Sequence, residues 1–295
     1  MSGSDSEAVL ADLELSRNLT IQWTVVGTLG VGVGIGIFSA IFQSATGAPV
    51  SYNFAPSGVG WWTEPLNLLV ILVLATAILI PHEWLHGLAI RYYGGEPRYG
   101  VGLAHFILPY AYATTDHRFS RGQFIVVLLA PLVVLTAVGV PLMIAFGWGW
   151  LVLPLAANAG GAVGDIWMTL TLLGYPDHVQ VEDHRSGIRI LGQEGDRPRD
   201  LSVAATVWDA LVGAAVAAVG ILLILSIGGL FFLDALNIGS ITVGTPGTVT
   251  HIFAYRNTPE EISISIGLGV PITGGVVGLL FSFIRSFRRL GNQDP

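Results

Sequence analysis

The segment best suited to chemistry holds two histidines four residues apart, with a glutamate after the first. It reads His82-Glu83-Trp84-Leu85-His86. On a helix, residues four apart lie on one face, so both imidazoles can bind one metal ion. Glu83 lies beside them and can serve as general base toward a water molecule at the metal. Chance produces such a segment in roughly one of 200 sequences of this length. The alternative is a pair of histidines hydrogen-bonded inside a helical bundle.

The third metal ligand is expected to be Asp165. A catalytic zinc takes three protein ligands and keeps one position open, and the chain has no cysteine. Asp165 is the only other acid deep in a predicted membrane segment. It lies about 24 Å along its helix and His82 about 25 Å along another, so both belong at one depth. His105 and His117 compete for this position, and a buried acid paired with arginine or hydroxyls is the alternative for Asp165.

The chain around these residues has the composition of a membrane protein. Of its 295 residues, 52% are hydrophobic and 11% are charged, whereas soluble domains carry roughly 25% charged residues. About 20 apolar residues cross a bilayer. We therefore predict an all-α polytopic membrane protein with six transmembrane helices, at 20–43, 65–90, 122–146, 149–173, 205–233 and 262–284.

These helices divide the chain into four parts. We expect a cytoplasmic N-terminal segment at 1–19, a four-helix membrane core with the metal site at 20–173, a cytoplasmic loop at 174–204, and two further transmembrane helices with a cytoplasmic tail at 205–295. Glycines spaced along the first, fourth and sixth helices are interpreted as close-packing positions. The remaining histidines are interpreted as solvated loop residues: His178, His184 and His251.

The placement of arginine predicts the orientation in the cell membrane. All thirteen basic residues are arginines, and all but Arg256 lie in the two termini or in the loops after the second and fourth helices. By the positive-inside rule both termini and these two loops are cytoplasmic, which places the active site near the cytoplasmic side. The first residues are too acidic for a signal peptide. The excess of twenty acids over thirteen arginines favours a halophilic source, with a genome that prefers arginine codons as the alternative.

The motifs of this chain resemble those of intramembrane zinc metalloproteases of the site-2 protease type. The sequence is more similar still to a family of zincin-like membrane peptidases long known as a domain of unknown function. The resemblance covers roughly residues 80–190 and is carried by four stretches, at 82–87, Ser120-Arg121-Gly122-Gln123-Phe124, Ala130-Pro131 and Gly164-Asp165. It implies that His82, His86 and Asp165 bind zinc and that Glu83 is the base. The site-2 pattern also has an Asn before its Asp, so Asn158 is a candidate for binding substrate or an oxyanion. Here no proline lies between Asn158 and Asp165, and Ile166 follows.

Two connecting segments are expected to form hairpins. Residues 99–115 are apolar for a loop and contain alternating tyrosines, so we consider a hairpin that re-enters the membrane or, equally, a loop on the headgroups. Site-2-like enzymes are thought to bind extended substrate along such a hairpin. A small cytoplasmic hairpin is expected at 178–191, around Ser186-Gly187.

The leading hypothesis is a Zn²⁺ metallopeptidase acting on a membrane protein or peptide, with the lipid bilayer as surroundings and no nucleic acid as partner. The same ligand set suits a non-haem iron oxidase, but a glutamate next to the first ligand has no task there. The third class is a non-proteolytic transporter or scaffold with a structural metal site. The sequence shows no second motif of this kind and no repeat, which disfavours a transporter built from repeated halves.

Overall fold

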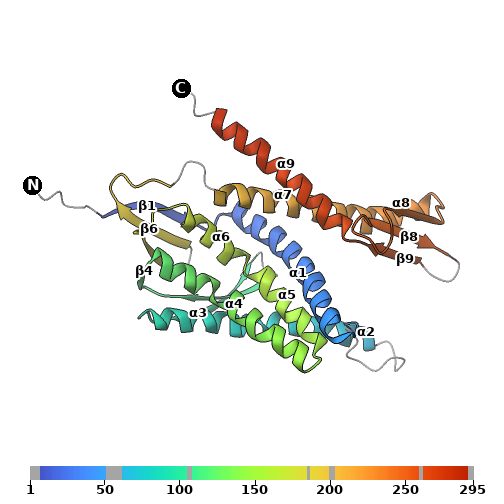
Figure 1. The fold of residues 1–295 in the computed structure, drawn as a ribbon, viewed down its shortest axis with the longest axis horizontal. Coiled ribbons are helices and arrows are strands. Elements are labelled where there is room, and N and C mark those ends of the chain that lie inside the picture. The colour runs from blue at the N-terminus through green and yellow to red at the C-terminus, as the bar shows by residue number, and fades with distance from the viewer. Residues whose placement is uncertain are drawn as a thin grey trace, which may run out of the picture. The chain divides into compact units, whose positions relative to one another are not determined.

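The computed structural model describes residues 7–50, 62–104, 108–184, 187–198, 203–258 and 262–291 (Figure 1). It divides into two compact units. The first comprises residues 1–23 and 30–202, and the second comprises residues 24–29 and 203–295.

The first unit contains the predicted metal-site residues. Its elements in chain order are β1 (Glu7–Glu14), α1 (Arg17–Thr46), α2 (Thr63–Ala77), α3 (Leu79–Tyr92), β2 (Arg98–Ala104), β3 (Leu108–Thr114), β4 (Arg118–Ser120), α4 (Arg121–Ala145), the 3-10 turn η1 (Gly149–Leu151), α5 (Val152–Gly161), α6 (Val163–Leu173), β5 (Gln180–His184) and β6 (Gly187–Gln193).

The second unit consists of a helical pair and a small sheet. Its elements are α7 (Val203–Leu223), the π-helical turn η2 (Ile224–Gly228), α8 (Gly229–Ala235), β7 (Ser240–Val243), β8 (Phe253–Asn257), β9 (Ile262–Ile266) and α9 (Gly269–Gly291).

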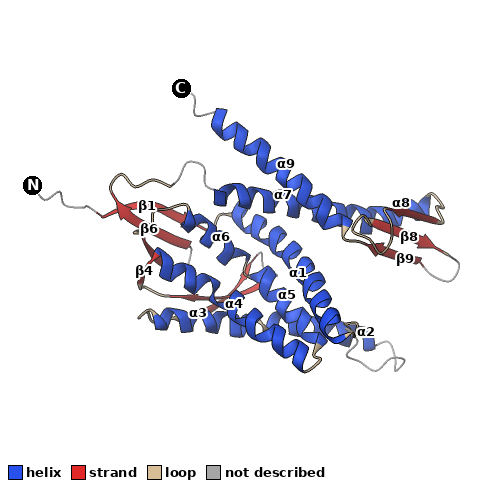
Figure 2. Ribbon diagram, viewed as in Figure 1, coloured by secondary structure: helices blue, strands red, loops and turns tan. Residues whose placement is uncertain are grey.

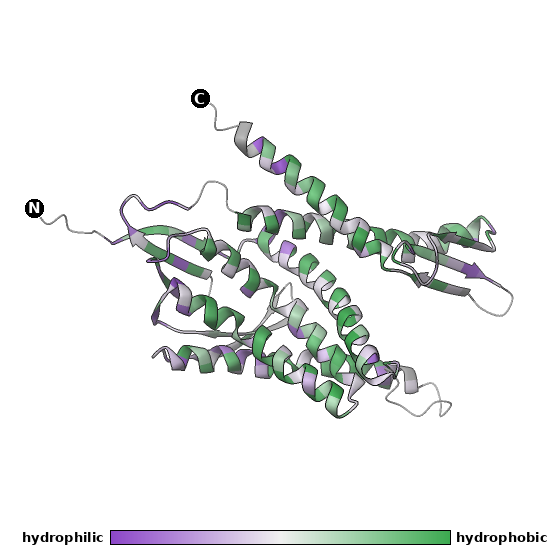
Figure 3. Ribbon diagram, viewed as in Figure 1, coloured by the Kyte–Doolittle hydropathy of each residue, from purple (hydrophilic) through white to green (hydrophobic). Residues whose placement is uncertain are grey.

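Six helical stretches of the described residues are long and apolar enough to cross a membrane, as predicted. They are Arg17–Thr46, Pro65–Tyr92, Arg121–Ala145, Gly149–Leu173, Val203–Ala235 and Gly269–Arg288. Hydrophobic residues dominate these helices in Figure 3. The sixth stretch begins at Gly269 and not at residue 262, because Ile262–Ile266 is a strand.

The prediction of an all-α protein is wrong in one respect, because the described residues also form three small antiparallel sheets (Figure 2). One has four strands in the order β1-β6-β5-β4, one is the hairpin β2-β3, and one has the order β7-β8-β9. The hairpin expected at 178–191 is β5-β6, and its tip at 185–186 lies outside the described residues. It is part of a larger sheet, because the N-terminal segment contributes β1.

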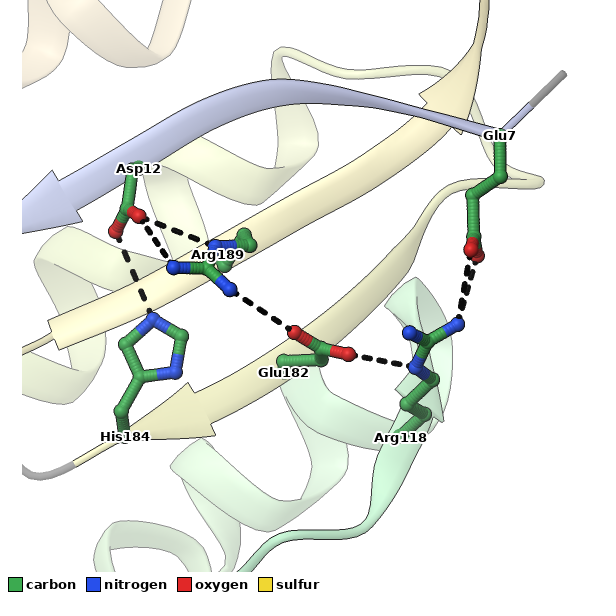
Figure 4. A network of polar contacts seen from close by, with 6 residues as sticks. All are labelled: Glu7, Asp12, Arg118, Glu182, His184 and Arg189. Carbon is green, nitrogen blue, oxygen red and sulfur yellow. Dashed lines mark hydrogen bonds and ion pairs between the residues drawn. The ribbon is translucent and has the colours of Figure 1, made fainter.

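The four-stranded sheet has one apolar and one charged face. On the apolar face, the fully buried Phe119, Val181 and Ile190 pack in one core with residues of α3, α4 and α6. On the other face, charged side chains from all four strands form a ladder of ion pairs (Figure 4). Its shortest contacts are Arg118 Nε to Glu182 Oε1 at 2.6 Å, and Arg118 Nη1 to Glu7 Oε1 and Arg189 Nη2 to Asp12 Oδ2, both at 2.8 Å.

These exposed ion pairs favour the pairing of particular strands, but they add little to the stability of the fold. Each exposed pair is worth roughly 0 to 1 kcal/mol. The hydrogen bond from Arg189 holds the pKa of Asp12 below its ordinary value. His184 was expected to be a solvated loop residue, but it lies in β5 with its Nε2 3.6 Å from Asp12 Oδ1.

Small residues allow α1 and α5 to pack closely, as predicted for the glycines of the first helix. A Cβ added to Gly30 would lie 3.1 Å from the Cα of Gly160, and one added to Gly34 would lie 3.0 Å from the Cα of Ala156. Gly32 and Gly36, on another side of α1, have nothing within 4 Å of an added Cβ.

The second unit is held by close contact between α7 and α9. An added Cβ at Gly278 would lie 2.2 Å from the carbonyl oxygen of Ala210. Arg285 of α9 donates a 2.6 Å hydrogen bond to the buried carboxylate of Asp209 on α7. His251 was expected to be solvated, but it is buried, with its Nε2 3.0 Å from the hydroxyl of Ser265.

Candidate metal centre

Both helical stretches that carry the predicted ligands are interrupted just before those ligands. Between α2 and α3 the break falls at Ile78. Pro81 has no N–H and cannot donate to the carbonyl of Ala77, which accounts for this break. His82 follows at once, in the first turn of α3.

The second interruption separates α5 from α6 at Ala162. Glycines flank it at 160, 161 and 164, and glycine is a poor helix former. Asp165 lies in the first turn of α6. A carboxylate is favoured there because the free N–H groups of a helix start carry partial positive charge.

The structure brings His82, His86 and Asp165 together. The Nε2 atoms of the two histidines lie 3.2 Å apart. Asp165 Oδ2 lies 3.4 Å from the Nε2 of His82 and 3.6 Å from the Nε2 of His86. Both histidines are buried, and the Asp165 side chain is 13% exposed. Among the described residues, these three form a group that could hold a metal ion.

Hydrogen bonds to the other ring nitrogens orient both imidazoles. His86 Nδ1 lies 2.9 Å from the carbonyl oxygen of Val127, which can only accept, so this nitrogen carries the proton. His82 Nδ1 lies 2.8 Å from the Asn158 amide oxygen and donates to it in the same way. Each Nε2 therefore presents a lone pair to the centre. Metal-binding histidines are fixed by such partners.

The donor set fits a divalent metal such as zinc. Three acceptor atoms converge, and neutral imidazoles leave no proton between them, so a cation is the partner that such a group attracts. Ligand atoms on a tetrahedral zinc, with bonds of about 2.0 to 2.2 Å, lie roughly 3.3 to 3.6 Å apart. The observed separations of 3.2, 3.4 and 3.6 Å agree with that requirement.

Glu83 lies next to this group and is held by the hairpin β2-β3. Its carboxylate accepts a hydrogen bond from the backbone N–H of Ala113 in β3. On the same side, an added Cβ at Gly87 would lie 1.8 Å from the phenol oxygen of Tyr99 in β2. The absence of a side chain at Gly87 therefore lets the hairpin approach α3. The tip of the hairpin, at 105–107, lies outside the described residues.

Asn158 was predicted to bind substrate or an oxyanion, and that role stays a prediction. Asn158 is 1% exposed. Its amide oxygen faces His82, and its amide nitrogen lies 3.5 Å from the carbonyl oxygen of Pro131. These contacts hold the Asn158 side chain beside His82, one of the predicted ligands. Sequence reasoning missed this contact, and also missed the carbonyl of Val127.

The competing histidines do not join the group where the structure describes them. His117 stacks edge-on against Phe119, with ring centroids 4.8 Å apart. His178, which was expected to be a solvated loop residue, is half exposed, and its Nε2 lies 2.7 Å from Asp196 Oδ2. His105 lies outside the described residues.

The described residues form a mostly helical fold with six helices able to cross a membrane and a buried His-His-Asp group able to hold a metal. Residues 75–179 match the model of the family described as "putative zincin peptidase". This range is about a third of the chain and contains α3, the hairpin β2-β3, α4, Asn158 and Asp165. The resemblance expected from the sequence is thus confirmed for this stretch. Searches among curated proteins and among solved structures found no match.

Proposed function

We propose that this protein is a membrane-embedded zinc metallopeptidase that cleaves peptide bonds of membrane-associated proteins or peptides. The observation that carries the proposal is the convergence of three buried ligand atoms, with a glutamate on the adjacent helical position. The family match over residues 75–179 supports the same class.

In this proposal His82, His86 and Asp165 hold zinc, which when bound would polarise the scissile carbonyl and lower the pKa of water. Glu83 accepts a proton from the attacking water and delivers it to the leaving amine nitrogen. The N–H of Ala113 holds the carboxylate of Glu83 in place for both transfers.

The active site is proposed to lie near the cytoplasmic side, with both termini in the cytoplasm. The sheet β1-β6-β5-β4 supports this orientation. Its strands come from the N-terminal segment, the loop after the second span and the loop after the fourth span. Antiparallel pairing requires these segments to lie on one side of the bilayer, and they are the arginine-rich segments.

Metal analysis and cleavage assays test the proposal together. The purified protein should contain about one zinc per chain, and His86→Ala should abolish binding. Candidate single-span membrane proteins, co-expressed with the enzyme, should be cut near the cytoplasmic side of their spans. Glu83→Gln should keep its zinc and lose roughly 10²- to 10⁴-fold in rate, the usual share of general acid–base catalysis.

The matched control is Glu14→Gln, which makes the same change at an exposed end of β1. It should cleave at the wild-type rate. Full cleavage by Glu83→Gln would remove Glu83 from the mechanism. A zinc-loaded protein without any cleavage would favour a structural metal site in a scaffold or transporter.

A further inference from the structure

An acid occupies a position of β5 where the strand pattern calls for an apolar residue. Asp183 lies opposite Ile188 of β6, and Val181 lies opposite Ile190. Opposite and alternate residues share a face of a sheet, so Asp183 points toward the apolar core with these three. Its neighbour Glu182 points to the charged face (Figure 4). Burial raises the pKa of the Asp183 carboxyl to about 7.

The partners of Asp183 explain how the acid is tolerated there. Its carboxylate accepts hydrogen bonds from the hydroxyl of Thr114 and from the backbone N–H of Thr115. Thr115 is buried. A buried polar group is costly unless it is hydrogen-bonded, and these two donors meet that need. Asp183 thus ties the four-stranded sheet to the end of β3.

Ala113, which holds Glu83, directly precedes the two threonines that bind Asp183. The N–H of Ala113 donates to the Glu83 carboxylate, while Thr114 and Thr115 donate to Asp183. Two acids, one from α3 and one from β5, therefore hold three consecutive residues of one strand end. Any shift of that end moves the hydrogen bond from Ala113 to Glu83.

We infer that Asp183 is a positioning residue for Glu83, which it acts on through the backbone of residues 113–115. The inference rests on the proposed function, in which Glu83 is the general base. Asp183 is neither a metal ligand nor a substrate contact in this scheme, although its carboxyl group interacts electrostatically with His86. A misplacement of about 1 Å at a catalytic group can cost on the order of 10²-fold in rate. We therefore expect Asp183→Ala to lower kcat by roughly 10- to 100-fold.

The first test compares variants on the two faces of β5. Asp183→Ala should lower kcat while KM and the zinc content remain at wild-type values. Asp183→Asn keeps an acceptor oxygen for Thr115 and should retain most of the rate. Glu182→Gln is the matched control on the opposite face, and it should keep the wild-type kcat although it weakens ion pairs to Arg118 and Arg189.

Hydrogen exchange supplies a readout that does not depend on activity. The segment 108–117 should exchange faster in Asp183→Ala than in the wild type, and Glu182→Gln should leave its exchange unchanged. If Asp183→Ala does not fold, Thr114→Val takes its place. It removes one of the two donors, so it should raise the exchange and lower kcat by a smaller factor.

A double-mutant comparison separates positioning from a general structural role. In the Glu83→Gln background, Asp183→Ala should change the residual rate less than twofold, because the group it positions is already absent. A structural role would give the same loss in both backgrounds. That result, or a full kcat in Asp183→Ala, overturns the inference while the enzyme itself remains active. A wild-type protein without cleavage, or a Glu83→Gln variant with full cleavage, overturns the proposed function and this inference with it.

Discussion

His82 and His86 each use one ring nitrogen to bind a neighbour, which leaves the other nitrogen for a metal. The sequence predicted the residues of this group for two reasons. The four-residue spacing of the histidines can be read directly from the sequence, and so can the distance of His82 and Asp165 along their predicted helices. It did not predict the neighbours, because a backbone carbonyl such as that of Val127 has no signature in a sequence. Asn158 was singled out, but its partner depends on how α5 packs against α3 and α4.

The contact between Asn158 and His82 leads to a prediction about zinc affinity. Asn158→Ala leaves the buried Nδ1 of His82 without its acceptor, and loss of such a partner typically weakens metal binding by roughly 10- to 100-fold. Asn158→Asp keeps an acceptor oxygen and should bind zinc more tightly than the Ala variant. Competition with a chelator of known affinity measures both. Equal affinities in wild type and Asn158→Ala would show that the contact does not support the ligand.

The raised pKa of Asp183 predicts how stability depends on pH. The folded protein favours the neutral carboxyl, so this contribution is complete below about pH 4 and is lost as the pH rises through about 7. The shift corresponds to about 4 kcal/mol. Asp183→Asn should remove this dependence and should raise Tm at pH 8 more than at pH 5. If the difference in Tm between the wild type and Asp183→Asn is the same at every pH, the raised pKa of Asp183 is contradicted.

At the scale of elements, the hairpin β2-β3 reaches α3 because Gly87 has no side chain. Gly87→Ala places a Cβ 1.8 Å from the Tyr99 oxygen, so the tyrosine or the hairpin must move. Overpacking of this kind costs typically 1 to 3 kcal/mol. We expect lower activity in Gly87→Ala and recovery when Tyr99→Ala is added, as measured by cleavage rate. If the double variant cleaves no faster than Gly87→Ala, a clash with Tyr99 does not cause the loss of activity.

The glycines of α1 give a second prediction at this scale. Gly34→Leu should lower Tm, because Ala156 of α5 lies against that position. Gly32→Leu is the matched control on the same helix, and it should not lower Tm because nothing lies within 4 Å. A similar drop in both variants would assign the effect to the helix itself and not to its packing.

The helices were predictable from hydropathy, but the strands were recovered only in part. Strand β1 contains an irregularity between Val9 and Ala11 that breaks the alternation of its side chains, so its pattern was not recognised. Strand β9 reads Ile262-Ser-Ile-Ser-Ile266, which is a clear period of two. The sixth predicted span includes this strand because isoleucine is apolar both in a strand and in a transmembrane helix.

At the scale of the whole molecule, the arginine pattern and the sheet pairing lead to one topology. The sheet β1-β6-β5-β4 joins three segments that the positive-inside rule assigns to the cytoplasm. The sheet β7-β8-β9 is built between the fifth and sixth spans. Five crossings lie between a cytoplasmic N-terminus and that connection, so we expect the connection on the outer side. The orientation of the chain in the membrane remains a prediction.

Cysteine labelling measures this orientation directly, because the native chain has no cysteine. Glu194→Cys lies in the turn after β6, and Val249→Cys lies between β7 and β8, where the side chain is 60% exposed. An impermeant thiol reagent should label Val249→Cys in intact cells. It should label Glu194→Cys only after the membrane is permeabilised. The reverse result would invert the chain and place the metal centre near the outer side. Labelling of both positions in intact cells would put the two sheets on one side, which requires an even number of spans between them and contradicts the single span at Val203–Ala235.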